Sequence, residues 1–181
     1  MVGTVRFLVP GGGGLKTLDD MGLAPWGVDA RRSAAAVGVD LTSTWDCATM
    51  GVRPGVTGSR VRLGLAIYHG LLLALRENQI RTVTAVLDER VRRLLTSVGL
   101  VMHTFPGTRT AAYLGSEGST PVYAHVAAAV DDQRRRLPDA HRLVTMGVGL
   151  GITVPEAGAF RRVVREPAAP ALVSAPVGHL G

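Results

Sequence analysis

The amino-acid sequence predicts an α/β fold, a mixed sheet with helices on both of its faces. Stretches rich in β-branched residues, typical of strands, alternate with stretches whose apolar residues recur at helical spacing. The 181 residues, 46% of them hydrophobic, are enough for one domain of ordinary size with a real core. We expect a core domain at residues 1–128 and a C-terminal extension, partly disordered, at residues 129–181.

The first strand is expected at residues 2–9, VGTVRFLV, which are rich in β-branched and apolar side chains. Pro10 and the four glycines at residues 11–14 end this strand. Glycines and prolines then recur as far as residue 44. They leave room for only one short helix, at residues 30–36.

The second strand is expected at residues 43–52, STWDCATMGV, where the side chains suit an alternating pattern. Successive side chains of a strand point to opposite faces. One face would therefore carry Thr44, Asp46, Ala48 and Met50, and the other Trp45, Cys47 and Thr49. Cys47 is the only cysteine, which excludes an internal disulfide and a cysteine-based zinc site, and we interpret it as a small core residue.

A helix at residues 60–78 is the most regular element of the chain. Its apolar residues recur at spacings of three or four, the pattern of a helix with one buried face: Val61, Leu65, Tyr68, Leu72 and Leu75. A third strand, TVTAVL at residues 82–87, leads into a helix at residues 88–99, DERVRRLLTSVG. Two shorter strands are expected at residues 101–105 and 121–126.

The glycine run at residues 11–14 invites comparison with a phosphate-binding loop. Such a loop needs the pattern GxxxxGK[ST], because its last glycine lets the lysine reach the phosphates at the start of a helix. Here Leu15 stands directly before Lys16, and Gly22 and Pro25 interrupt any long helix. We therefore interpret the run as a turn and not as a nucleotide site.

Charge and composition exclude several classes of function. The net charge of +6 comes almost entirely from arginine and modestly favours acidic partners. The five histidines lack the spacing of a metal site and aromatic residues make up only 4% of the chain, so we expect neither a metal nor a nucleic acid. No apolar stretch of membrane-spanning length and no secretory signal is visible, which predicts a cytoplasmic protein without membrane contact.

Three stretches, taken in order, resemble the acyl-homoserine-lactone synthase family, a branch of the GNAT acyltransferase fold. Family members carry GxxRLLP in one strand, WExSRF in the next, and VxDxRxERxLxxxG after a long amphipathic helix. In this chain GTVRFLVP at residues 3–10 matches the first motif, and Arg6 stands at the position of the arginine in GxxRLLP. WDCATM at residues 45–50 matches the second, with Asp46 on its glutamate, and VTAVLDERVRRLLTSVGL at residues 83–100 matches the third.

The resemblance covers about residues 2–127 and implies a GNAT-like, mostly antiparallel sheet, but several features depart from the family pattern. Thr49 stands where the family has the arginine of WExSRF, and Asp46, whose side chain is shorter, stands where the family has the glutamate. The loop between the first two motifs is also longer than in the family. The family's N-terminal helices and strands, which surround the amine substrate, have no counterpart here. Two alternatives therefore stay open: another N-acyltransferase of the same fold, such as an N-acyl amino acid synthase, and a non-catalytic remnant that binds acyl carrier protein.

The resemblance implies a reaction in which an amine attacks an acyl thioester carried on phosphopantetheine. The donor would be an acyl carrier protein or acyl-CoA, the acceptor S-adenosylmethionine, and the product an acyl-homoserine lactone, a quorum-sensing signal. Both reactants are substrates, so no tightly bound cofactor is expected. Asp46 would be the catalytic base if burial raises its pKa, and Arg6 would support it or orient a carboxylate. The alternative for Asp46 is structural, a bond to a backbone amide or to an arginine.

The resemblance also places the thioester. The end of the second strand and the loop into the following helix would bind the phosphopantetheine arm, through Met50, Gly51, Val52, Arg53, Gly55, Gly58, Ser59 and Arg60. Ala48 and Met50 would line the acyl pocket. The alternative is a plain strand-to-helix turn in which Ser59 caps the helix.

Two kinds of partner are expected. Six arginines could receive an acidic carrier protein, namely Arg90, Arg92, Arg93, Arg134, Arg135 and Arg136, although a solvated helix surface would look the same. The first strand, without its expected neighbours, would expose an edge that a second copy could cover in a homodimer.

Overall fold

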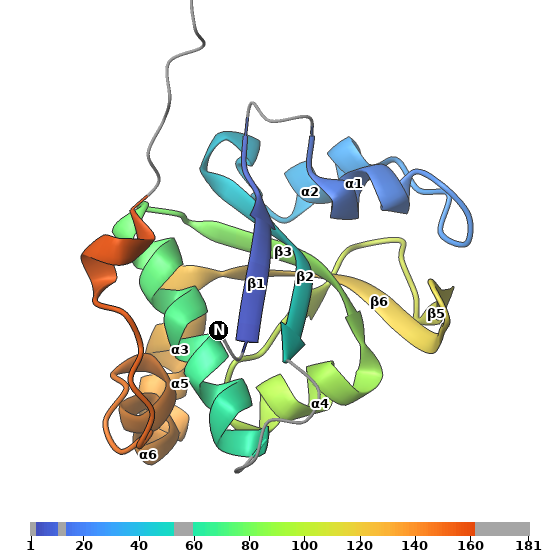
Figure 1. Cartoon of the computed structure of the whole chain (residues 1–181). Helices are drawn as coiled ribbons and strands as arrows, with labels where there is room; N and C mark the ends of the chain where they lie inside the picture. The colour runs from blue at the N-terminus through green and yellow to red at the C-terminus, as the bar shows by residue number, and fades with distance from the viewer. Residues whose placement is uncertain (1–2, 11–13, 53–59, 162–181) are drawn as a thin grey trace, which may run out of the picture.

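The computed structural model describes residues 3–10, 14–52 and 60–161. Its centre is a six-stranded mixed sheet of order β1-β2-β3-β6-β4, in which β5 pairs with the N-terminal part of β6 (Figure 1). The strands are β1 (Gly3–Leu8), β2 (Thr44–Val52), β3 (Thr82–Asp88), β4 (His103–Thr104), β5 (Ala111–Tyr113) and β6 (Ser116–His125). Every pair is antiparallel except β2 and β3. The predicted fold class, a mixed and mostly antiparallel sheet flanked by helices, is confirmed.

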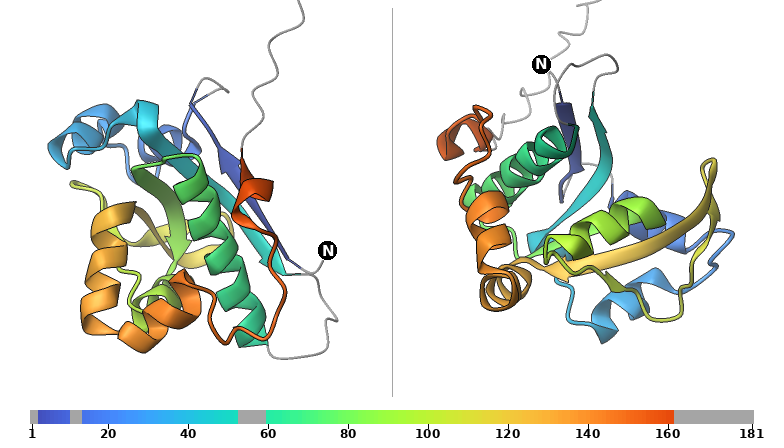
Figure 2. Two further views of the ribbon diagram at one scale, coloured as in Figure 1. Left: turned by 90° about the vertical axis from the view of Figure 1, so that its left-hand side faces the viewer. Right: turned by 90° about the horizontal axis from the view of Figure 1, so that it is seen from below.

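Helices cover both faces of the sheet (Figure 2). They are α1 (Lys16–Met21), α2 (Ala30–Ala36), α3 (Arg60–Glu77), α4 (Glu89–Ser97), α5 (Val126–Arg136) and α6 (Pro138–Ala140). The predictions for β1, β2, β3, β4, α2, α3 and α4 are confirmed to within two residues. Strand β6 begins five residues before the strand expected at residues 121–126, and α1, α5, α6 and β5 were not predicted. None of the helices in the described part of the chain is long and apolar enough to cross a membrane.

One face of the sheet packs against α1 and α2. The strand register aligns Asp46 with Thr84, and Thr84 with Tyr123, so these side chains form one row across three strands. The apolar core on this side consists of Leu15, Leu18, Met21, Ala34, Val39 and Phe105. Because the apolar residues of α1 are spaced by three, this short helix holds its inner face against the row that contains Asp46.

The opposite face packs against α3, α4 and α5. The neighbouring row of the sheet, Trp45, Val83 and Ala124, meets Ala74 and Leu75 of α3. Val144 and Leu150, in the chain that follows α6, are buried in one cluster with Tyr68 and Leu72 of α3. The described part of the predicted extension thus packs on this core, and residues 162–181 lie outside the described residues. The proposed boundary at residue 128 stays a prediction.

A β-bulge in β2 changes which side chains share a face. Phe7 pairs with Cys47 but Arg6 pairs with Thr49, so Ala48 is an extra residue on β2. Met50 consequently lines the same cavity as Cys47, on the α3 side, while the side chain of Asp46 lies on the α1 side. The prediction that Asp46, Ala48 and Met50 share one face is therefore wrong, because strict alternation does not continue through a bulge.

Candidate active site

The parallel strands β2 and β3 stay paired over only a short distance. Their register contains three residue pairs, Thr44 with Thr82, Trp45 with Val83 and Asp46 with Thr84. Beyond these pairs β2 continues along β1 as far as Val52, and β3 continues along β6 as far as Asp88. The two strands therefore diverge immediately after Asp46 (Figure 1).

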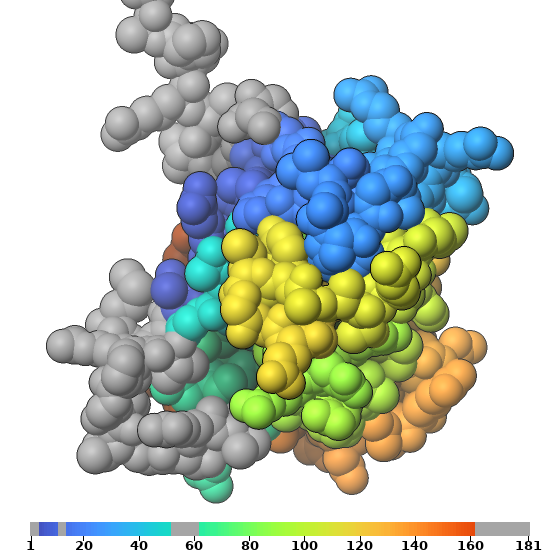
Figure 3. All heavy atoms as spheres, turned by 90° about the vertical axis from the view of Figure 1, so that its right-hand side faces the viewer, coloured from blue at the N-terminus to red at the C-terminus, as the bar shows by residue number. Residues whose placement is uncertain are grey.

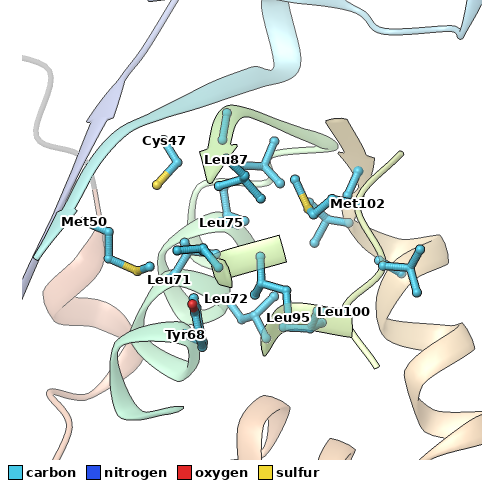
Figure 4. A pocket seen from close by; sticks show the side chains of 17 residues that line it. Cys47, Met50, Tyr68, Leu71, Leu72, Leu75, Leu87, Leu95, Leu100 and Met102 are labelled. Atoms are coloured by element: carbon cyan, nitrogen blue, oxygen red, sulfur yellow. The ribbon is translucent and has the colours of Figure 1, made fainter. Parts of the chain in front are cut away.

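An apolar cavity of about 70 Å³ lies on the α3 side of this divergence (Figure 4). Cys47 and Met50 of β2, Ala85 and Leu87 of β3, and Tyr68 of α3 are among its 17 lining residues. All of these residues are described, and none of them carries a formal charge. The cavity therefore suits an alkyl group rather than a polar ligand.

Asp46 lies at the divergence but faces α1. Its side chain is 1% exposed and accepts two hydrogen bonds from Thr17, one from the backbone N–H at 2.5 Å and one from Oγ1 at 3.0 Å. The N-cap of α1 is Leu15, which has no side chain able to bond the free amides of the first turn. The carboxylate of Asp46, from a distant strand, supplies that bond instead. The structural alternative for Asp46, a bond to a backbone amide, is thus present.

The same environment raises the pKa of Asp46 to about 6, from an ordinary value of 3.8 for aspartate. Burial is the main cause, since it disfavours the charged carboxylate. The two bonds from Thr17 and the charge of Lys16 act in the opposite direction, and the charge of Asp20 adds to the effect of burial. A carboxyl group with this pKa is largely ionised at neutral pH and yet is a stronger base than an exposed aspartate.

Replacing Thr17 by valine is expected to raise the pKa of Asp46 further, by about one unit. Valine keeps the shape of threonine and the backbone N–H, but it removes the hydroxyl that donates to the carboxylate. The measurement is a carboxyl ¹³C NMR titration, with the Asp46→Asn variant identifying the resonance. A pKa of Asp46 that falls or stays constant in Thr17→Val would contradict the role assigned to this hydroxyl.

The charged side chains of Lys16 and Asp20 on α1 act on Asp46 and form a network with Tyr113 of β5. Figure 3 shows the α1 region, in blue, against the region of β5 and β6, in yellow. Lys16 Nζ is 2.6 Å from Asp20 Oδ2 and 2.8 Å from Tyr113 Oη, and the Tyr113 hydroxyl donates to Asp20. Trp26 packs on the ring of Tyr113 at 5.0 Å between centroids and donates to the carbonyl of Arg109 at 2.7 Å. The sequence provided no signal for this network, because β5 lacks a clear strand pattern and its partners come from far along the chain.

The other predicted site residues lie in different places. Arg6 is exposed on β1 opposite Thr49, and within the described residues the hydrogen bonds to the carboxylate of Asp46 all come from Thr17. Met50 lines the cavity, whereas Ala48 is not among the lining residues.

For the phosphopantetheine arm, Met50, Gly51 and Val52 end β2 and Arg60 begins α3. Arg53, Gly55, Gly58 and Ser59 lie outside the described residues. The roles assigned to all of these residues stay predictions.

The arginines proposed for a carrier protein form ion pairs and hydrogen bonds within the fold. Arg93 lies 3.7 Å from Glu89 on α4, and Arg92 donates to Thr104 Oγ1 at 3.1 Å. On α5, Arg134 pairs with Asp131, and both Arg135 and Arg136 pair with Asp132. The arginine side chains of these ion pairs are exposed, so the pairs are weak and leave the guanidinium groups accessible. The bond of Arg92 is partly buried, and Arg90 is exposed.

Cys47 has the environment of a core residue. Its thiol lines the apolar cavity, and burial together with the charge of Asp46 raises the pKa of Cys47 to about 11. Very little of the thiol is ionised at neutral pH, so a nucleophilic role is not supported.

The fold resembles solved structures of a CoA-dependent acyl-homoserine lactone synthase, BjaI, one with SAM and isopentyl-CoA and another with MTA. Each superposition has a TM-score of 0.50 and 14% sequence identity, over 76% of this chain and 59% of that protein. No protein-family model and no curated protein matches the sequence. The likeness confirms the fold implied by the three motifs, and this chain spans less than two thirds of the length of BjaI.

Proposed function

We propose that this chain is an N-acyltransferase that moves an acyl group from a phosphopantetheine thioester to an amine. The observation that carries the proposal is a buried carboxyl group, Asp46, placed where two parallel strands diverge beside an apolar cavity. The cavity would hold the acyl chain on one face of the sheet, and the amine would approach from the face of Asp46. The reacting thioester would lie in the divergence between them.

In this reaction the nitrogen of the amine attacks the thioester carbonyl. Asp46, acting through a water molecule, takes the proton that the nitrogen must lose, and its pKa of about 6 suits that task near neutral pH. The C–N bond forms, the C–S bond breaks, and the thiol of phosphopantetheine leaves with a proton. Backbone N–H groups of β2 beyond Asp46, which have no partner on β3, are suitable donors to the developing oxyanion.

For the acceptor we propose S-adenosylmethionine. After acylation its carboxylate oxygen would close the lactone ring, the C–S bond to the sulfonium would break, and methylthioadenosine would leave, which gives an acyl-homoserine lactone. The support is the likeness to BjaI, a synthase whose solved structures contain SAM, MTA and isopentyl-CoA. The acyl donor would be either acyl-CoA or an acidic acyl carrier protein. The exposed arginines of α4 and α5 would receive the carrier protein.

The proposal is tested by thiol release from a panel of acyl-CoA and acyl carrier protein thioesters. Each thioester is combined with S-adenosylmethionine or with free amino acids, and the products are identified by mass spectrometry. Release that requires S-adenosylmethionine supports the synthase activity, whereas release with an amino acid moves the chain to the wider class of N-acyltransferases. A folded protein that releases no thiol from any combination would refute the enzymatic proposal.

A further inference from the structure

Helix α3 separates two apolar spaces on the same face of the sheet. One is the cavity of about 70 Å³ beside the divergence of β2 and β3. The other is a groove of about 540 Å³ between α3, the strands β1 and β2, and residues 152–160. Phe7, Trp45 and Phe160 are among the residues that line the groove.

Leu71 belongs to the walls of both spaces. Tyr68, Leu72 and Leu75 of α3 line the cavity alone, while Ile67, Gly70 and Ala74 line the groove alone. The helical period places residue 71 on the boundary between these two stripes. Among the described residues that line either space, only Leu71 lines both, and its side chain is visible at the edge of the cavity in Figure 4.

The small cavity limits the length of chain that it can hold. On the scale on which a cavity of about 150 Å³ binds benzene, a cavity of about 70 Å³ takes only a short alkyl chain. The neighbouring groove has several times this volume and an apolar lining, but the leucine side chain stands between the two spaces.

We infer that Leu71 is the partition that restricts this protein to short acyl chains. The inference rests on the proposed function, because it assigns the cavity to the acyl group. Leucine to alanine removes three carbon atoms from the partition and joins the cavity to the groove. A longer chain would then continue into the groove, and each further methylene group buried there would strengthen binding about fourfold.

The test is isothermal titration calorimetry of the whole chain with S-alkyl phosphopantetheine thioethers, from butyl to dodecyl. These probes carry the arm common to CoA and carrier proteins, and they bind without reacting. The wild type is expected to prefer the short probes, and Leu71→Ala to prefer probes longer by several carbons. Leu72→Ala is the matched control, because Leu72 lines the cavity but not the groove.

A double variant checks where the longer chain lies. Ile67 lines only the groove, one turn before Leu71, so Leu71→Ala combined with Ile67→Phe is expected to restore the preference for short probes. If Leu71→Ala does not fold, as judged by circular dichroism, Leu71→Val removes one carbon and is expected to give a smaller shift in the same direction.

Failure of the inference and failure of the proposed function give different results. If the wild type binds the probes but Leu71→Ala and Leu72→Ala change the length preference equally, or not at all, Leu71 is not the partition. If the wild type binds none of the probes, the acyl-transfer proposal fails and the inference fails with it.

Discussion

Replacing Asp46 by asparagine is expected to lower kcat/KM for amide formation by about 10² to 10⁴, the usual contribution of a general base. Asparagine has nearly the same size and can still accept a bond from the Thr17 amide, so the fold should persist. In the wild type the rate should rise with pH through about 6, where Asp46 loses its proton, and this limb should be missing from the variant. The measurement is the pH dependence of thiol release.

The same substitution is expected to increase stability at alkaline pH. The pKa of Asp46 is higher in the fold than the value of 3.8 of an unperturbed aspartate, so the protonated form is the one that the fold favours. The stability that protonation contributes is complete below pH 3.8 and is lost as the pH rises through about 6. Asparagine does not ionise, and by about pH 8 it should raise the free energy of unfolding by up to about 3 kcal/mol.

Urea unfolding at about pH 4 and about pH 8 checks this expectation. The matched control is Asp139→Asn, a change of the same chemistry at an exposed position of α6, which should alter neither activity nor stability. An Asp46→Asn variant that keeps the wild-type rate would show that Asp46 only caps α1.

Truncation of Phe105 to alanine is expected to be the most destabilising of the substitutions considered, with a loss of about 3–5 kcal/mol. Phe105 is 1% exposed, lies in the core beneath α1 and α2, and packs against Tyr123 with ring centroids 5.0 Å apart. A loss of that size is a large part of the total stability of an ordinary domain. The measurement is urea unfolding at neutral pH.

Leu114 provides the control for Phe105. Its side chain is 79% exposed, so Leu114→Ala should change the free energy of unfolding by less than about 0.5 kcal/mol. If both variants lose similar small amounts, the cluster around Phe105 is not the core that holds α1 and α2 on the sheet.

Much of the fold could be predicted from local patterns. β-branched runs identified β1, β2 and β3, and the apolar spacing of α3 identified the longest helix. The missed helix α1 shows why such patterns fail: Leu15, Leu18 and Met21 have helical spacing, but the preceding glycines and the following Gly22 suggested a turn. Packing against Phe105 and Tyr123, which are far away in sequence, stabilises this six-residue segment.

The candidate site was predictable only in part. The motif resemblance identified Asp46, and burial in the fold raises its pKa as that role would require. The bond from Thr17 could not be foreseen, because it joins a helix and a strand 29 positions apart in the sequence. Nor could the bulge at Ala48, which depends on how β1 and β2 pair and turns Met50 toward the cavity.

The short pairing between β2 and β3 also has a mechanical consequence. Only three residue pairs join the part of the sheet made of β1 and β2 to the part made of β3, β6, β4 and β5. These pairs lie at one end of the two strands. A small rotation about them would widen the divergence while every other strand pairing stays intact, and it would be resisted by α3, which packs on Trp45 of β2 and on Val83 of β3.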